Sequence, residues 1–133
     1  GKRLSADLAI IDKRRSGPGK SEVMNVIGDV KDKTCIIFDD LVDSGGTIVN
    51  AASALKKKGA KDVYAYVVHG VLTGEAAKKI NNSKIKKFVI SNSILNIKKI
   101  KKSKKFQVIS VGTLFAEAIK RISISKSVSK LFK

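Results

Sequence analysis

Hydrophobic residues in this chain gather in short, nearly continuous runs that are separated by polar or glycine-containing stretches. Runs without strict polar alternation are typical of strands that are covered on both faces, as in a parallel sheet. The pattern therefore predicts five strands, at residues 8–11, 35–38, 63–68, 88–90 and 108–111.

Helical spacing of apolar positions appears between and after these runs. The clearest helix spans residues 47–58, and Gly59 follows it where a left-handed residue would end the helix. Further helices are predicted at residues 75–80 and 114–122. Because strands and helices alternate, we predict an α/β domain with a parallel, doubly wound sheet flanked by helices.

Two segments fall outside this alternation, at residues 13–21 and 95–105. The first contains two glycines and the only proline of the chain, so we predict a mobile loop. Its position directly after a predicted strand makes it a candidate lid over a binding site.

Composition agrees with a folded domain. The 133 residues fit one domain, and 43% hydrophobic with 29% charged residues is globular composition. The single cysteine, Cys35, lies in an apolar run, which favours a buried thiol in a reducing cytoplasm. Without a membrane-length apolar stretch or a secretory signal, we expect a cytoplasmic protein with no membrane partner. The chain opens without Met, at residues that read like the end of a helix, so we expect a piece of a longer protein.

The net charge of +17 raises the question of a nucleic-acid partner, because clustered Lys and Arg release counterions from phosphate backbones. No acidic residue occurs between Glu75 and Glu117, yet the lysines of that stretch flank ordinary strand and helix patterns. We interpret them as a solvated surface and expect no nucleic-acid partner. A basic nucleic-acid binder stays an alternative that rests on charge alone.

The candidate chemistry lies where the second predicted strand meets the first predicted helix. Asp39 and Asp40 end the strand, and a turn with two glycines leads into the helix. Ligands of open α/β sheets bind at such strand ends, and backbone amides at a helix N-terminus attract phosphate. The two carboxylates can accept hydrogen bonds from the hydroxyls of a ribose, directly or through a metal. The sequence therefore predicts a sugar-phosphate site.

This motif, Asp-Asp-x-x-Asp-x-Gly-Gly-Thr, is similar to the ribose-5-phosphate loop of phosphoribosyltransferases and PRPP synthetases. Further stretches resemble the PRPP synthetase (ribose-phosphate pyrophosphokinase) family in order and spacing. They are Asp-Leu-Ala-Ile-Ile-Asp-Lys-Arg-Arg at 7–15, Ser-Glu-Val-Met at 21–24, Ile-Gly-Asp-Val at 27–30, His-Gly at 69–70, Ile-Asn-Asn-Ser at 80–83 and Ser-Val-Ser-Lys-Leu-Phe at 127–132. The resemblance covers nearly the whole chain and implies a type I phosphoribosyltransferase-like fold.

The resemblance also implies roles for individual residues. Lys13 and Arg15 would be catalytic residues on a flexible loop that closes over ATP. Asp39 and Asp40 would bind the ribose hydroxyls or magnesium. The 5-phosphate would be held by the loop residues Asp43, Ser44, Gly45, Gly46 and Thr47.

Further implications concern regulation and partners. Ser127, Ser129 and Phe132 match tail positions that line an allosteric site between subunits in regulated members of the family. The resemblance implies Mg²⁺ as cofactor, ribose 5-phosphate and ATP as substrates, PRPP and AMP as products, and a homo-oligomer, in the family a hexamer. The product would feed purine, pyrimidine, histidine and NAD biosynthesis.

Comparison with the family pattern also indicates which part of a full-length member this chain would lack and where its residues differ. By this resemblance the chain would correspond to the C-terminal half of family members and would lack their N-terminal, ATP-binding half, so we predict negligible synthetase activity for the chain alone. Ser93 stands where the family commonly has Thr, which keeps a hydroxyl. His69, the only histidine, has no Cys or second His nearby in the sequence, so a structural role is favoured over a metal site.

Two other classes stay open from the sequence. A phosphoribosyltransferase would use the same sugar-phosphate loop but consume PRPP, and nothing here resembles the base-binding hood of such enzymes. A silent homologue that only regulates active subunits would not need Lys13, Arg15 and an intact loop.

Overall fold

The computed structural model describes residues 5–14, 23–94 and 97–132. Its centre is a parallel four-stranded sheet with strand order β3-β4-β5-β6. The strands are β3 (Thr34–Val42), β4 (Asp62–Gly70), β5 (Lys87–Ser91) and β6 (Phe106–Ile109). The predicted α/β class with a parallel sheet flanked by helices is confirmed.

The helices lie close to their predicted positions. They are α1 (Gly46–Lys57), α2 (Ala76–Asn81), α3 (Ile97–Ile100) and α4 (Gly112–Ser123), followed by a 3-10 turn, η2 (Val128–Phe132). Gly59 ends the first helical region with φ +92, as the left-handed stop requires, and its amide bonds to the carbonyl of Lys56 at 3.1 Å. None of the helices in the described ranges is both long and apolar enough to cross a membrane.

The first strand differs from the prediction. β1 (Ile10–Arg14) pairs antiparallel with β2 (Val23–Ile27) in a separate two-stranded sheet. The reason is the length of the connection: residues 15–22 are too few for the crossover of a dozen or more residues that parallel pairing needs. The predicted lid at residues 13–21 lies outside the described residues, except that Lys13 and Arg14 belong to the backbone of β1.

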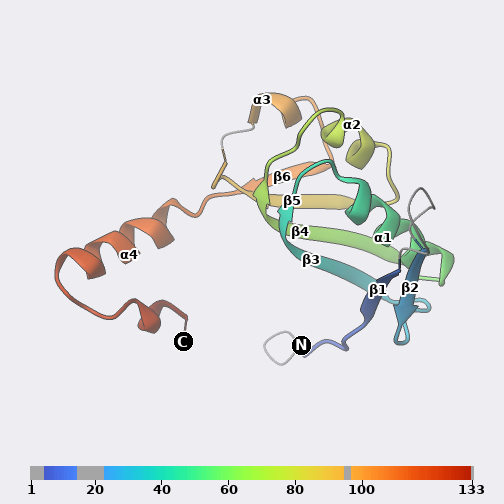
Figure 1. Ribbon diagram of the computed structural model, residues 1–133, viewed down its shortest axis with the longest axis horizontal. Helices are drawn as coiled ribbons and strands as arrows, with labels where there is room; N and C mark the ends of the chain where they lie inside the picture. Colours follow the sequence, from blue (N-terminus) through green and yellow to red (C-terminus); the bar gives the residue numbers. More distant parts are fainter. Residues whose placement is uncertain (1–4, 15–22, 95–96, 133) are drawn as a thin grey trace.

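The core lies between the sheet and the helices α1 and α2, which cover one of its faces (Figure 1). Its largest fully buried side chains are Val63, Leu72, Ile80, Ile85 and Phe88. Because large apolar side chains contribute about 1.5–3 kcal/mol each when buried, this cluster accounts for much of the stability of the domain.

Among the described residues, the opposite face of the sheet is exposed at β3 and β4, so the expectation of strands covered on both faces is not met there. Ile36 and Phe38 of β3 and Tyr66 and Val68 of β4 are exposed there, and the rings of Phe38 and Tyr66 contact each other at 5.7 Å between centroids. β3 also forms the edge of the sheet. The strand that carries the candidate site therefore lacks a neighbour on one side among the described residues.

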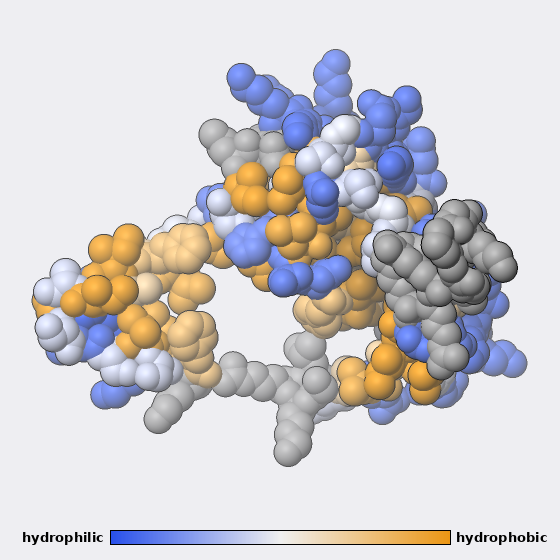
Figure 2. All heavy atoms as spheres, viewed as in Figure 1, coloured by the Kyte–Doolittle hydropathy of each residue, from blue (hydrophilic) through white to orange (hydrophobic). Residues whose placement is uncertain are grey.

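The C-terminal part of the chain is arranged differently. α4 extends away from the sheet and contacts η2, and neither element has a buried residue (Figure 1). Figure 2 shows hydrophobic atoms on the surface of this arm. The exposed apolar residues of α4 are Leu114, Phe115, Ile119 and Ile122.

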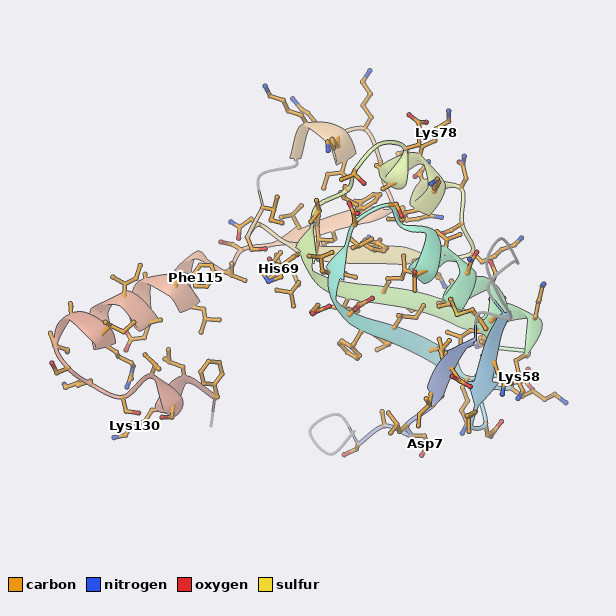
Figure 3. The ribbon with its side chains drawn as sticks, viewed as in Figure 1. Asp7, Lys58, His69, Lys78, Phe115 and Lys130 are labelled. Carbon is orange, nitrogen blue, oxygen red and sulfur yellow. The ribbon has the colours of Figure 1, made fainter. Side chains whose placement is uncertain are left out.

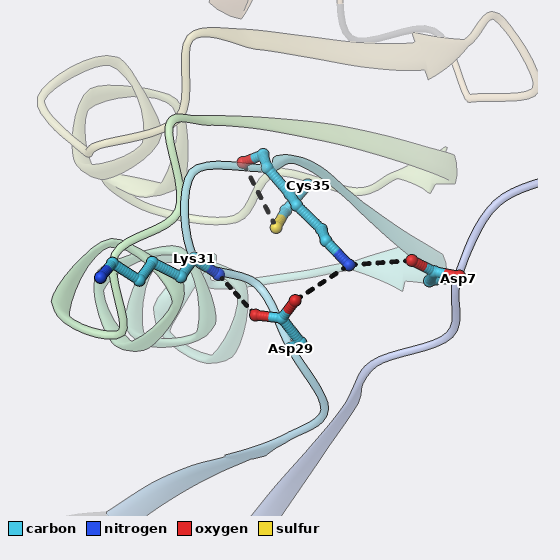
Figure 4. A network of polar contacts seen from close by, with 5 residues as sticks. Asp7, Asp29, Lys31 and Cys35 are labelled. Atoms are coloured by element: carbon cyan, nitrogen blue, oxygen red, sulfur yellow. Dashed lines mark hydrogen bonds and ion pairs between the residues drawn. The ribbon is translucent and has the colours of Figure 1, made fainter.

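Ion pairs tie the N-terminal segment to the turn before β3 (Figure 4). Lys33 Nζ lies 2.9 Å from Asp7 Oδ2 and 3.2 Å from Asp29 Oδ2. The hydrogen bonds to Asp7 and Asp29 raise the pKa of Lys33, and the bond from Lys33 lowers the pKa of Asp29. All three side chains are substantially exposed, so the pairs orient the segment more than they stabilise the fold.

Candidate functional site

The predicted phosphate loop joins the end of β3 to the start of α1. Asp43 and Ser44 form an exposed bend, and Gly45 precedes the helix with φ 76 and ψ −2. This left-handed conformation turns the chain sharply into the helix, and it disfavours any residue with a Cβ. A Cβ on Gly45 would also lie 3.4 Å from the side chain of Ile80.

The N-terminus of α1 is open. No side chain caps it, and among the described residues no acceptor is recorded for the amides of Gly46, Thr47 and Ile48. The first hydrogen bond of the helix runs from the amide of Val49 to the carbonyl of Gly45 at 3.2 Å. Free amides at the positive end of a helix dipole bind anions.

α4 provides an internal contrast. The amide of its N-cap residue, Val111, donates to Asn92 Oδ1 at 2.9 Å, and the amide of its first residue, Gly112, donates to Ser110 Oγ at 3.2 Å. The first helical amide of α4 is therefore held by a side chain, whereas that of α1 is available to a ligand.

Space is available in front of α1 as well. A Cβ added to Gly46 would meet no atom within 4 Å, unlike one added to Gly45. Thr47, one residue further, is exposed and offers a hydroxyl at the same end of the helix. Gly45 is therefore required by the left-handed backbone of the turn, whereas Gly46 lies beside open space. A phosphate can approach the helix amides through that space.

A segment that follows β4 braces this turn from behind. The amides of Val71 and Leu72 donate to the carbonyl of Val42, and the amide of Thr73 donates to the carbonyl of Asp43 at 3.1 Å. Leu72 is fully buried in a left-handed conformation, φ 52, which costs about 1–2 kcal/mol for a residue with a Cβ. Sequence reasoning missed this brace, because nothing in the sequence marks Leu72 as left-handed.

Asp39 and Asp40 are both exposed at the end of β3, next to the loop. The amide of Asp40 donates to Asp39 Oδ1 at 3.0 Å. The pKa of Asp39 is raised from its ordinary value of 3.8, mainly because partial burial penalises the charged form. With Thr47, Asp39 belongs to the lining of a cavity of about 550 Å³ that follows the free edge of β3.

A magnesium ion at this site would need ligands from water and substrate phosphates in addition to those from the protein. The described residues contain no group of three or more His, Cys, Asp or Glu side chains that could hold a metal by themselves. Magnesium, however, keeps several waters and is usually held by one or two carboxylates together with substrate phosphates. The two carboxylates of Asp39 and Asp40 fit that mode.

His69 lies at the end of β4, beside the strand that carries the acids (Figure 3). Its Nδ1 lies 2.8 Å from Ser93 Oγ, and Ser93 Oγ lies 2.8 Å from Ser91 Oγ. His69 has no Cys or second His nearby in the sequence, and the structure shows a hydroxyl partner instead. The position of Ser93 shortly after the predicted strand at 88–90 was the one signal that could have indicated this contact.

The other predicted site residues are not brought to this loop by the described structure. Lys13 lies in β1 and its side chain is not described, and Arg15 lies outside the described residues. Ser127 and Ser129 are in or next to η2, at the far end of α4, where their hydroxyls lie 2.6 Å apart. Phe132 in the same turn is exposed.

Many lysines have structural contacts of their own. Lys58 Nζ donates to the carbonyl of Val26 at 2.7 Å, and Lys99 Nζ donates to the carbonyl of Leu72 at 2.8 Å. Lys105 Nζ donates to the carbonyl of Ser83 at 2.9 Å, and burial lowers its pKa. Part of the positive charge therefore serves to satisfy backbone carbonyls at turns and helix ends.

Comparisons with known proteins agree on one family. The family model described as "Phosphoribosyl synthetase-associated domain" matches residues 9–133. A ribose-phosphate pyrophosphokinase of Bradyrhizobium diazoefficiens is 56% identical over 131 residues, which cover 98% of this chain and 41% of that protein. One from Clostridium tetani is 57% identical over 130 residues, which cover 98% of this chain and 40% of that protein.

A solved structure gives the same result for the fold. The crystal structure of phosphoribosylpyrophosphate synthetase from Mycobacterium smegmatis is similar with a TM-score of 0.82 and 34% identity, covering 93% of this chain and 39% of that one. The chain thus spans about two fifths of the length of the relatives that it matches.

Proposed function

The chain belongs to the phosphoribosyl synthetase-associated domain family, and from this premise we propose that it forms the ribose-5-phosphate-binding half of a ribose-phosphate pyrophosphokinase. The reaction transfers the pyrophosphoryl group of ATP to ribose 5-phosphate and gives PRPP and AMP. The proposal fits the names of the two relatives described above, which are pyrophosphokinases and not phosphoribosyltransferases.

One observation carries the proposal: an uncapped helix N-terminus follows, after a three-residue turn, a strand that has two exposed carboxylates near its end. The amides of α1 would hold the 5-phosphate, with Ser44 and Thr47 adding hydroxyl donors. Asp39 and Asp40 would accept hydrogen bonds from the ribose hydroxyls or bind a magnesium ion that also contacts ATP phosphates. This arrangement would fix the sugar with its anomeric oxygen free.

In the proposed reaction that anomeric oxygen attacks the β-phosphorus of ATP. A new O–Pβ bond forms as the anomeric hydroxyl releases its proton to solvent, the bond between Pβ and the oxygen that bridges to Pα breaks, and AMP leaves with that oxygen. Charge on the non-bridging oxygens needs cationic groups, and we propose Lys13 and Arg15 for this role. Magnesium, when bound, would neutralise part of the same charge.

We propose that the chain corresponds to the C-terminal half of its relatives and that the adenine pocket belongs to the remaining three fifths of their length. The purified 133-residue chain is therefore expected to form no PRPP from ATP and ribose 5-phosphate. A cytoplasmic location and assembly into a homo-oligomer, in the family a hexamer, are part of the same proposal. Steady PRPP formation by the chain alone would contradict this division of roles.

Calorimetric titration of the chain with ribose 5-phosphate and Mg²⁺ tests the binding half of the proposal. Thr47→Val removes a hydroxyl at the open helix end, and Thr34→Val makes the same change at the opposite end of β3. A hydrogen bond to a charged phosphate contributes about 1.5–3 kcal/mol, so Thr47→Val should weaken binding roughly 10- to 100-fold. Thr34→Val should bind as the wild type does.

Either of two results would overturn the proposal. The wild-type chain could show no saturable heat with ribose 5-phosphate, or the Thr34→Val variant could lose as much affinity as Thr47→Val. Duplex DNA serves as a control for charge. If the chain binds DNA with an affinity that falls as salt rises and that neither substitution changes, the result would instead support a nucleic-acid partner.

A further inference from the structure

His69 and two serines form a small polar network at the ends of β4 and β5. Two contacts join these side chains to one another, and two join the serines to the carbonyl of Val68. His69 Nδ1 to Ser93 Oγ is 2.8 Å, Ser93 Oγ to Val68 O is 3.2 Å, Ser91 Oγ to Val68 O is 2.7 Å, and Ser91 Oγ to Ser93 Oγ is 2.8 Å. Ser91 is buried and Ser93 is half-buried, so the network is held in place by the fold.

Proton counting favours one tautomer of the imidazole. If Nδ1 carries the proton, three hydrogens are available, one from the ring and one from each hydroxyl, and one of the four contacts is left without a proton. If Nδ1 is bare, only the two hydroxyl hydrogens remain, and two pairs of acceptors face each other at hydrogen-bond distance without a proton. Since unpaired acceptors in a half-buried site are costly, the Nδ1–H tautomer is favoured.

In that tautomer Nε2 carries a lone pair and faces away from Ser93. Ser93 follows β5, and β3 is the neighbour of β4 on the other side. His69 is paired in register with Leu41, two residues past Asp39 and two before Asp43. Among the described residues, none is recorded as a hydrogen-bond partner of Nε2.

We propose that His69 is a positioning residue of the sugar-phosphate site, whose Nε2 accepts a hydrogen bond from a hydroxyl of the bound sugar. Ser93 and Ser91 fix the tautomer and the orientation of the ring. The proposal rests on the proposed function, because it takes ribose 5-phosphate as the ligand. The only histidine of the chain would then bind the ligand through Nε2 as well as contact serine through Nδ1.

The first test does not depend on the ligand. A single histidine gives one pair of ring-nitrogen resonances in a long-range ¹H–¹⁵N correlation spectrum, recorded in mildly alkaline buffer. We expect Nδ1 at a protonated and Nε2 at an unprotonated nitrogen shift in the wild type. Ser93→Ala should return the ring to a mixture of tautomers. A protonated Nε2 in the wild type would overturn the proposal.

The second test uses ribose 5-phosphate. An Asn side chain can replace Nδ1 and keep the bond to Ser93, whereas a Gln side chain can place its carbonyl near the position of Nε2. We therefore expect His69→Asn to weaken binding roughly three- to tenfold, and His69→Gln to recover part of that loss. The wild-type Nε2 resonance should move on binding, and inorganic phosphate alone should not move it.

The outcomes separate this inference from the proposed function. If ribose 5-phosphate binds, depends on Thr47 and leaves the Nε2 resonance and the His69→Asn affinity unchanged, the role of His69 is wrong and the proposed function stands. If the wild-type chain binds no ribose 5-phosphate, the proposed function fails and the role of His69 in binding fails with it.

Discussion

The helices α1 and α4 look alike in sequence and differ in almost every structural respect. Each has 12 residues, an apolar stripe and basic residues in its last turn. α1 buries Ile48, Ala51, Ala52 and Leu55 against the sheet, whereas α4 buries nothing. Their N-termini differ in the first helical amide, because that of Gly112 in α4 bonds to Ser110 Oγ and that of Gly46 in α1 is open. An apolar stripe predicts a helix, but it does not predict what the helix packs on or what its end can bind.

The largest expected difference between the two regions is in stability. Phe88 is fully buried in the core and Phe115 of α4 is 53% exposed, so the same substitution compares them. Phe88→Ala should cost about 3–5 kcal/mol of unfolding free energy through lost transfer energy and a cavity. Phe115→Ala should stay within about 0.5 kcal/mol. Chemical denaturation of both variants checks this, and equal losses would show that α4 is packed in solution.

The two glycines of the loop sharpen the comparison at the helix N-terminus. Gly45→Ala should destabilise the chain by about 1–2 kcal/mol, because alanine is strained at φ 76 and its Cβ meets Ile80. Gly46→Ala should leave stability unchanged or slightly higher, because no atom lies within 4 Å and alanine favours helix. Thermal unfolding measures both.

The same pair separates folding from binding. The methyl group of Gly46→Ala enters open space at the end of α1, so this variant should fold normally and bind ribose 5-phosphate more weakly. Gly112→Ala, at the first residue of α4, is the matched control and should bind as the wild type does. Full affinity in Gly46→Ala would mean that phosphate does not approach the amides from this side.

The smallest expected effect is a pH dependence at Asp39. Its folded-state pKa is raised by burial, so the folded state binds the proton more tightly than the unfolded state does. The stabilising contribution is therefore complete below about pH 3.8, the ordinary value, and is lost as pH rises through the raised pKa. Asp39→Asn should remove this loss of unfolding free energy with rising pH, which denaturation curves recorded from acid to neutral pH measure. An identical pH profile in the variant would contradict the burial argument.

Much of the fold could be predicted from the sequence, because local patterns decide it. The first helix was predicted at residues 47–58 and found at Gly46–Lys57, and Gly59 ends the helical region in the expected conformation. The antiparallel pairing of β1 was missed, since apolar runs report burial and not strand direction. For α4 the spacing of apolar residues correctly predicted a helix. It could not predict that the helix is exposed, because exposure depends on contacts between residues distant in sequence.

The site was predictable only in part. The motif identified the loop because glycines and carboxylates at a strand end have few structural explanations. The brace by Leu72 and the network of His69, Ser91 and Ser93 depend on strand register and side-chain geometry, which the sequence does not give. The roles of Lys13 and Arg15, and of Ser127, Ser129 and Phe132, stay predictions.

The central claim is that the open N-terminus of α1 binds the phosphate of ribose 5-phosphate. Backbone amide ¹H–¹⁵N spectra of the chain, recorded during titration with this ligand, test it most directly. We expect saturable shifts confined to the amides of residues 44–48 and the ends of β3 and β4, with none at the start of α4. Unsaturated shifts spread over the lysines between Glu75 and Glu117, or no shift at residues 44–48, would contradict phosphate binding at this helix end.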